Sequence, residues 1–237
     1  MRLSAPIYRL KQQAKSLSKQ RGIALNIALD HMARKEGFNS WGHPTHSARD
    51  TSSSSNLLSH FRSGDTVLLG ARPGHGKTML GLELALSASK NGDASAFFSL
   101  EYTLEDIRKR LNVLSQDQKR EADKIHLDLS DDICAEYVIK VLKCAPDVKL
   151  IVVDYLQLLD LKRSTPPLDH QVRALRAFAR SEQKVMVLIS QIDRSFETKN
   201  KTHPDLSDVR MPNPLDLSLF SKTCFLHDGT VEIRVNS

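Results

Sequence analysis

The amino-acid sequence predicts an α/β fold: a mostly parallel central sheet flanked by helices, with a small N-terminal helical hairpin. Three observations lead to this prediction. Short apolar runs alternate with helix-like patterns after residue 65, which is typical of a parallel sheet covered on both faces. The first strand leads into a glycine-rich loop that ends in Lys77 and Thr78. Polar residues also follow later strands, at the sheet edge where ligands bind in such folds.

Residues 66–80 have the layout of a P-loop, with a strand, a phosphate-binding loop and a helix in succession. Gly74 and Gly76 allow backbone N–H groups to turn toward an anion. We expect Lys77 to reach the β- and γ-phosphates of ATP and the Thr78 hydroxyl to ligate Mg²⁺. The predicted ATP-binding residues are Ala71, Arg72, Pro73, Gly74, His75, Gly76, Lys77 and Thr78. Ala71 replaces the first glycine of the strict pattern, which is tolerable if its φ stays negative.

The composition is that of an ordinary soluble globular protein. Of 237 residues, 40% are hydrophobic and 26% charged, which suits one α/β domain with a small appendage. The chain has no apolar run long enough for a membrane helix and no signal-peptide pattern, so we expect a cytoplasmic location without a membrane partner. Cys134, Cys144 and Cys224 are widely spaced, which predicts reduced thiols, neither disulfides nor zinc ligands.

The positive charge is concentrated near the N-terminus. The chain has a net charge of +6, and residues 1–36 alone carry eight basic and two acidic residues, so the remainder is neutral overall. A basic segment of this kind indicates a phosphate backbone or an acidic protein surface as partner. A helix surface that only faces water is the alternative.

The sequence divides into three parts. They are a basic helical appendage at 1–42, a Ser-rich linker at 43–56 and an ATPase domain at 57–237 that ends in a β-hairpin. Apolar spacing predicts two helices in the appendage, at 4–20 and 23–36, with Phe38 and Trp41 closing its small core. The polar linker, which includes four serines at 52–55, is expected to be flexible.

Strand and helix patterns alternate within the third part. The expected strands are 66–69, 94–99, 125–129, 150–153 and 185–190, with helices at 77–90, 104–114, 131–142 and 168–182. Thr103 and Ser130 each precede acidic residues and are predicted N-caps. Residues 192–215 are polar and suit a mobile loop. The final hairpin is expected to turn at Asp228-Gly229.

Polar residues at three strand ends are candidates for chemistry. Asp154 follows an apolar run as a Walker B acid does, and it would hold Mg²⁺ opposite Thr78. The Glu101 carboxylate could orient and deprotonate the attacking water, although an acid that only precedes a helix would give the same pattern. Gln191 could sense the γ-phosphate, and a plain strand-end amide is its alternative. Glu101, Lys77 and Gln191 are therefore the candidate catalytic residues.

Five motifs resemble, in the same order, those of the RecA-like ATPase domain of DnaB-type replicative helicases. They are LGARPGHGKT at 69–78, FSLE at 98–101, IVVDYLQLL at 151–159, ISQIDRSFE at 189–197 and SDVR at 207–210. The resemblance covers about 65–235. It implies that Glu101 is the catalytic glutamate, Asp154 the Walker B acid and Gln191 the γ-phosphate sensor. Tyr155 and Gln157 fall in one motif without an obvious chemical task.

The resemblance also implies ATP and Mg²⁺ as cofactors, single-stranded DNA as partner, and a homo-oligomeric ring such as a hexamer. Residues in the region that lines the DNA channel or subunit contact of such rings are Arg194, Lys199, Lys201 and Arg210. The chain departs from the family at two places. Its N-terminal part is small, and its final hairpin lacks the Lys-x-Arg arginine finger, for which Arg234 is a possible substitute.

Three functions are compatible with these patterns. The first is an ATP-hydrolysing DnaB-like helicase or translocase that acts on single-stranded DNA. The second is a RecA-fold ATPase that works as a regulatory switch through a protein partner, possibly the partner of the N-terminal basic segment. The third, a small-molecule kinase, usually needs an arginine-rich lid. The candidate lid is Lys162–Arg180, with Arg163, Arg173, Arg176 and Arg180, and it is explained more simply by the exposed side of a helix.

Overall fold

The computed structural model describes residues 7–35, 52–115, 119–159, 165–198, 201–211 and 213–236. The α-helices are α1 (Ile7–Arg21), α2 (Leu25–Lys35), α4 (Ser52–Ser59), α5 (Lys77–Lys90), α6 (Leu104–Leu114), α7 (Lys119–Ala122), α8 (Ala135–Lys143) and α9 (Leu168–Ser181). The strands are β1 (Thr66–Ala71), β2 (Ala94–Ser99), β3 (Ile125–Asp128), β4 (Val148–Asp154), β5 (Val185–Gln191), β6 (Lys222–His227) and β7 (Thr230–Val235). Short 3₁₀ turns are η1 (Leu156–Leu158), η2 (Arg194–Thr198), η3 (Leu206–Asp208) and η4 (Leu217–Leu219).

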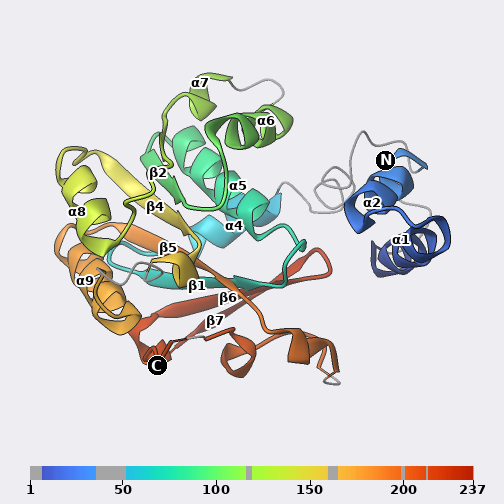
Figure 1. Ribbon diagram of the computed structural model, residues 1–237. Helices are drawn as coiled ribbons and strands as arrows, with labels where there is room; N and C mark the ends of the chain where they lie inside the picture. The colour runs from blue at the N-terminus through green and yellow to red at the C-terminus, as the bar shows by residue number, and fades with distance from the viewer. Residues whose placement is uncertain are drawn as a thin grey trace.

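The strands form one sheet in the order β3-β2-β4-β5-β1-β6-β7 (Figure 1). Neighbouring strands from β3 to β6 are parallel, and β7 alone runs antiparallel to its neighbour. Parallel neighbours require crossover connections, which the helices provide. The predicted mostly parallel α/β sheet is therefore confirmed.

Alternate residues of each central strand face two different cores. Leu68 of β1 packs in the core that contains α8 and α9, whereas Val67 and Leu69 pack in the core that contains α5 and α6. Figure 1 shows these helix pairs on opposite faces of the sheet. Helix α5 lies close to the sheet at Gly81, where an added Cβ would come within 2.8 Å of Ile189 Cδ1, so a larger residue would require the core side chains to shift.

Of the two predicted N-caps, Thr103 caps a helix and Ser130 does not. Thr103 caps α6 in a capping box, because its hydroxyl accepts from the Asp106 N–H while the Asp106 carboxylate accepts from the Thr103 N–H. Ser130 is not a helix cap. Its hydroxyl accepts from the Asp132 N–H in a turn, and α8 begins only at Ala135, whose N–H donates to Gln171 Oε1 at 2.9 Å. A side chain distant in sequence therefore decides where α8 starts.

The predicted flexibility of residues 52–55 is wrong, because these serines begin α4. Ser54 is buried, and its hydroxyl lies 3.2 Å from that of Ser87 on α5. Leu57 is buried in the α5 core. Contact with α5 thus orders a run that a sequence pattern assigns to a linker. The predicted loop at 192–215 also contains order, since an isolated bridge joins Ile192 to Val209.

Helices α1 and α2 pack on each other through a small core, which agrees with the predicted hairpin. The core residues are Leu10, Ala14, Ala28, Met32 and Ala33. Phe38, Trp41 and most of the expected linker lie outside the described residues, so the three-part division of the chain stays a prediction.

Cys134, Cys144 and Cys224 are free thiols, as expected. Among the described helices, none has the length and apolar character to cross a membrane.

A buried ion pair joins the starts of β1 and β6. Lys222 Nζ donates to the Asp65 carboxylate, which also accepts at 2.7 Å from the Arg62 N–H and the Ser221 hydroxyl. Burial opposes ionisation of Asp65, but these donors outweigh it and lower the pKa. Because the folded-state pKa lies below the unfolded one, the stabilisation is complete above the unfolded pKa and disappears as pH falls through the folded pKa.

Replacing Asp65 with Ala is expected to lower the free energy of unfolding at neutral pH by about 3–5 kcal/mol, because Lys222 is left buried and unpaired. Urea unfolding at neutral and acid pH measures this effect. The difference from wild type should shrink in acid. Asp93→Ala, at an exposed position before β2, is the control and should change little. Equal stability of the Asp65 variant and wild type at neutral pH would contradict a stabilising pair.

Candidate nucleotide-binding site

The phosphate loop connects β1 directly to α5. Gly74 and Gly76 have φ values of 78° and 81°, a region that other residues rarely adopt, and they turn the loop sharply before Lys77. Ala71 is buried in β1 and is absent from the described residues with positive φ. The tolerance expected for Ala at this position is therefore confirmed. Gly76 is the N-cap of α5 and brings no capping side chain to its first turn, which leaves room for an anion to approach the N–H groups there.

The side chains predicted to act on phosphate converge at the start of α5. Lys77 Nζ donates to Glu101 Oε2 at 2.6 Å and to Asp154 Oδ1 at 3.1 Å. Thr78 Oγ1 donates to Asp154 Oδ2 at 2.7 Å. The sheet brings the acids together, because Ser99 of β2 pairs with Asp154 of β4. An ammonium, a hydroxyl and two carboxylates thus meet at one edge of the sheet.

The electrostatics of this cluster follow from burial and pairing. Burial lowers the pKa of Lys77, but the Asp154 and Glu101 carboxylates outweigh it and raise the pKa above its ordinary value. Burial raises the pKa of Asp154, while Lys77 and Thr78 oppose that shift. Lys77 is therefore a charged donor already held by carboxylates. A phosphate that binds it must compete with Glu101, whose side chain is 33% exposed, or with the fully buried Asp154.

The Arg72 side chain connects the phosphate loop to the segment that follows β5. Its guanidinium donates to the Ile192 carbonyl at 2.8 Å and to Glu197 Oε1 at 3.1 and 3.2 Å. These contacts tie the loop to the segment after β5. The side chain of Arg72, a predicted ATP-binding residue, thus binds η2. At this position only the backbone is left to contact a phosphate.

Gln157 is a residue whose task the sequence did not reveal. Its Nε2 donates to Ser190 Oγ and to the Arg210 carbonyl, each at 2.7 Å, and its Oε1 accepts from the Gln191 N–H at 3.4 Å. It links the segment after Asp154 to the end of β5. A lone amide within the apolar run 156–159 was the available signal, because a buried amide needs partners.

The candidate sensor Gln191 lies beside Ala71 across β1 and β5. Its Oε1 accepts from Arg210 Nη1 at 3.4 Å. Arg194 and Arg210 are exposed, whereas Lys201 donates to Asp205 at 2.7 Å and Asp208 at 3.1 Å. The structure therefore joins Gln191 to one predicted contact residue, Arg210, and pairs Lys201 internally. Lys199 lies outside the described residues.

The terminal hairpin places Arg234 on the edge strand β7. Arg234 Nε donates to Glu232 Oε1 at 2.8 Å, and both side chains are partly exposed. The predicted turn at Asp228-Gly229 is confirmed, with both residues at positive φ. Arg234 is thus held within its own strand. Because it pairs with Thr223 near the start of β6, it lies at the end of the sheet away from the phosphate loop.

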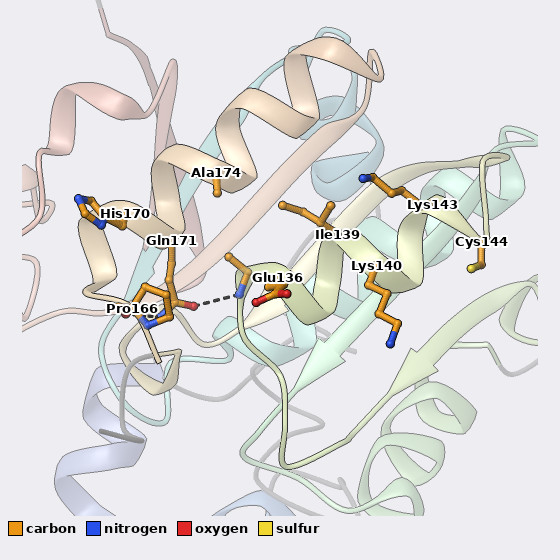
Figure 2. Close-up of a pocket in the computed structure, with 10 residues that line it drawn as sticks. Glu136, Ile139, Lys140, Lys143, Cys144, Pro166, His170, Gln171 and Ala174 are labelled. Carbon is orange, nitrogen blue, oxygen red and sulfur yellow. Dashed lines mark hydrogen bonds between the residues drawn. The ribbon is translucent and has the colours of Figure 1, made fainter. Parts of the chain in front are cut away.

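A separate cavity of about 590 Å³ lies between α8 and α9. Figure 2 shows Gln171 reaching from α9 toward the start of α8, with Ile139 and Ala174 forming apolar walls. Both helices belong to the core on the face of the sheet opposite α5. This cavity is therefore distinct from the phosphate loop.

Comparison with known proteins decides the family. The model of the DnaB-like helicase C-terminal domain matches residues 52–133 and 120–215. The chain belongs to this family. Among curated proteins, this DnaB-like domain is 27% identical over 191 residues to the replicative DNA helicase DnaB of Mycoplasma genitalium, covering 65% of the chain and 40% of the relative. It is 28% identical over 188 residues to DnaB of Helicobacter pylori strain J99, covering 65% and 38%.

Solved structures support the RecA-like fold of this DnaB-like domain. A DnaB-like replicative helicase, described with its interactions with primase, aligns with a TM-score of 0.60 and 22% identity over 75% of this chain and 53% of that chain. A second solved structure, of an ATPase domain, aligns with a TM-score of 0.56 and 21% identity, covering 70% of each chain. The DnaB-like domain spans less than half the length of the curated relatives it matches.

Proposed function

We propose that this DnaB-like domain binds and hydrolyses ATP with Mg²⁺ and uses the reaction to move along or unwind single-stranded DNA. The observation that carries the proposal is the convergence of Lys77, Thr78, Glu101 and Asp154 at the phosphate loop. Phosphoryl transfer needs mainly positioning and charge stabilisation, which these groups can supply. A small-molecule kinase has no comparable support from the family match.

Each residue has a defined task in the proposal. The loop N–H groups and Lys77 hold the phosphates, and Glu101 orients the attacking water and accepts its proton. Thr78 and Asp154 would hold Mg²⁺, since their oxygens lie together and are the ligand type this ion prefers. The bound ion would neutralise charge on the phosphates. ATP binding would draw Lys77 away from Glu101 and free this carboxylate for the water.

The segment after β5 is the proposed route from nucleotide to DNA. Gln191 would sense the γ-phosphate, and its contact with Arg210 links it to the exposed basic side chains at Arg194 and Arg210. Gln157 holds both Gln191 and Arg210. A shift at the phosphate would therefore reach residues that can contact DNA phosphates. Lys199 stays a proposed DNA or subunit contact outside the described residues, and Lys201 would have the supporting task of holding η3.

A homo-oligomeric ring such as a hexamer is part of the proposal, because the site as described holds no arginine from its own hairpin against Lys77. An arginine from a neighbouring copy would complete it and raise turnover. The pairing of Arg234 with Glu232 and the lack of a Lys-x-Arg pattern favour a second candidate, an ATP-dependent switch that binds a protein partner and unwinds nothing. The cytoplasmic location stays a prediction.

Turnover measured with and without oligothymidine tests the proposal. We expect single-stranded DNA to raise ATPase turnover and the nucleotide-bound protein to have the mass of a ring. The full chain with Lys15 and Lys19 changed to Gln tests the basic appendage, since both are exposed on α1 and each lost phosphate contact should weaken DNA binding. Lys140→Gln on α8 is the matched control. If the protein is folded and binds ATP but its ATPase turnover is the same with and without DNA, the ATP-dependent switch is favoured over the helicase.

A further inference from the structure

The turn of the β6–β7 hairpin lies against the phosphate loop. The His75 ring, from the loop, stacks on the His227 ring, from the end of β6, with centroids 5.4 Å apart and planes 13° apart. Asp228 follows in the turn, and its Oδ2 is 3.6 Å from His227 Nε2. Two elements far apart in sequence thus bring two imidazoles and a carboxylate together.

The ligand atoms of these three residues form a compact group. One atom from each of His75, His227 and Asp228 lies within 4.8 Å of the other two. A tetrahedral metal with bonds of about 2.0–2.1 Å holds neighbouring ligand atoms about 3.3 Å apart. Rotation of the His75 and Asp228 side chains can bring their ligand atoms from within 4.8 Å to the spacing that a metal needs, because His75 is only partly buried and Asp228 is exposed at the turn.

The surroundings hold the His227 ring in place. Phe196 packs edge-on against it, with centroids 5.0 Å apart. His203 lies at 6.2 Å and has its Nε2 2.8 Å from Thr230 Oγ1. Packing of this kind limits ring rotation and so reduces the entropy that ion binding must overcome.

We propose that His75, His227 and Asp228 form a binding site for a divalent transition metal ion of the Zn²⁺ class. Two imidazole nitrogens and one carboxylate oxygen match the three-ligand sites that leave a fourth position for water. Nitrogen ligands favour Zn²⁺, Co²⁺ or Ni²⁺ over Mg²⁺, so this site is different from the one at Thr78 and Asp154. The ion would fasten the terminal hairpin to the phosphate loop, whether or not the chain hydrolyses ATP.

Cobalt titration of the full, nucleotide-free chain tests the site, with binding followed by visible absorption and Zn²⁺ affinity measured against a chromophoric chelator. We expect one high-affinity ion per chain. His75→Ala, His227→Ala and Asp228→Asn should each weaken binding by at least about 100-fold, because each removes a direct ligand and loss of an outer-shell partner alone costs about 10- to 100-fold. His31→Ala and His60→Ala, at exposed positions on α2 and after α4, are the controls and should bind as wild type does.

Thermal unfolding separates a lost site from a lost fold. Zn²⁺ should raise the unfolding temperature of wild type and of the controls, because it binds only the folded state, and this rise should vanish in the three site variants. Asp228→Asn keeps the shape of the turn residue. If a histidine variant fails to fold, the zinc affinity of Asp228→Asn shows whether this group of residues binds the ion. Unchanged affinity in Asp228→Asn and either histidine variant, absence of zinc binding by wild type, or displacement of Co²⁺ by equimolar Mg²⁺ would overturn the proposal.

Discussion

Replacing Lys77 with Ala should reduce ATP affinity at least tenfold, because a charge-assisted hydrogen bond contributes about 1.5–3 kcal/mol and Lys77 is expected to make more than one to phosphate. The same change removes the cation beside the buried Asp154. Breaking a buried pair on one side costs about 3–5 kcal/mol of stability. Burial would then favour the protonated form of Asp154. Calorimetric titration with ATP and urea unfolding measure the two effects.

Lys77→Met separates loss of charge from loss of packing, since it keeps most of the side-chain volume and removes the ammonium; both effects should therefore persist in it. Lys90→Ala is the matched control, because Lys90 ends the same helix and is exposed. It should retain both affinity and stability. Unchanged ATP affinity in a folded Lys77 variant would exclude this lysine from the binding site and leave the loop as a structural turn.

Replacing Glu101 with Gln should lower the turnover of bound ATP about 10²–10⁴-fold, the range for loss of a general base. ATP affinity should stay the same or increase. The reason is that Glu101 accepts from Lys77 at 2.6 Å, and a neutral amide competes less well with phosphate for this ammonium. Single-turnover hydrolysis and equilibrium binding, measured on the same protein, separate the two quantities.

Glu105→Gln provides the comparison for Glu101. Glu105 lies on α6 four residues further along, is exposed, and pairs only at the surface with Lys109 at 2.7 Å. Its loss should leave hydrolysis unchanged. If Glu101→Gln turns ATP over at the wild-type rate, the water must be activated by another group, and Glu101 would act only as a partner of Lys77.

Local patterns predicted much of this fold. The strands and helices around the phosphate loop depend on hydrophobic periodicity and on glycine spacing, which are local properties. Lys77, Thr78, Glu101 and Asp154 were found because each stands at the end of a strand or loop. Parallel strands bring such ends to one edge of the sheet. Their catalytic roles stay predictions.

Other features could not be predicted because they depend on distant partners. The start of α8 is decided by Gln171, which lies beyond the next strand in the chain. The serines at 52–55 are ordered by contact with α5 through Ser54 and Ser87. Gln157 can link β5 to the Arg210 segment only because the fold brings both beside its amide. No local window of sequence contains these pairs.

Glycine conformation and apolar periodicity act over a few neighbouring residues, and these local properties are enough to predict the phosphate loop and the parallel sheet. Which of the distant charged residues face one another depends on how the strands and loops pack. The fold pairs Lys77 with two carboxylates and places His75 on His227. The physical reason is that electrostatic interaction depends on distance in space, and the order of strands in the sheet sets that distance.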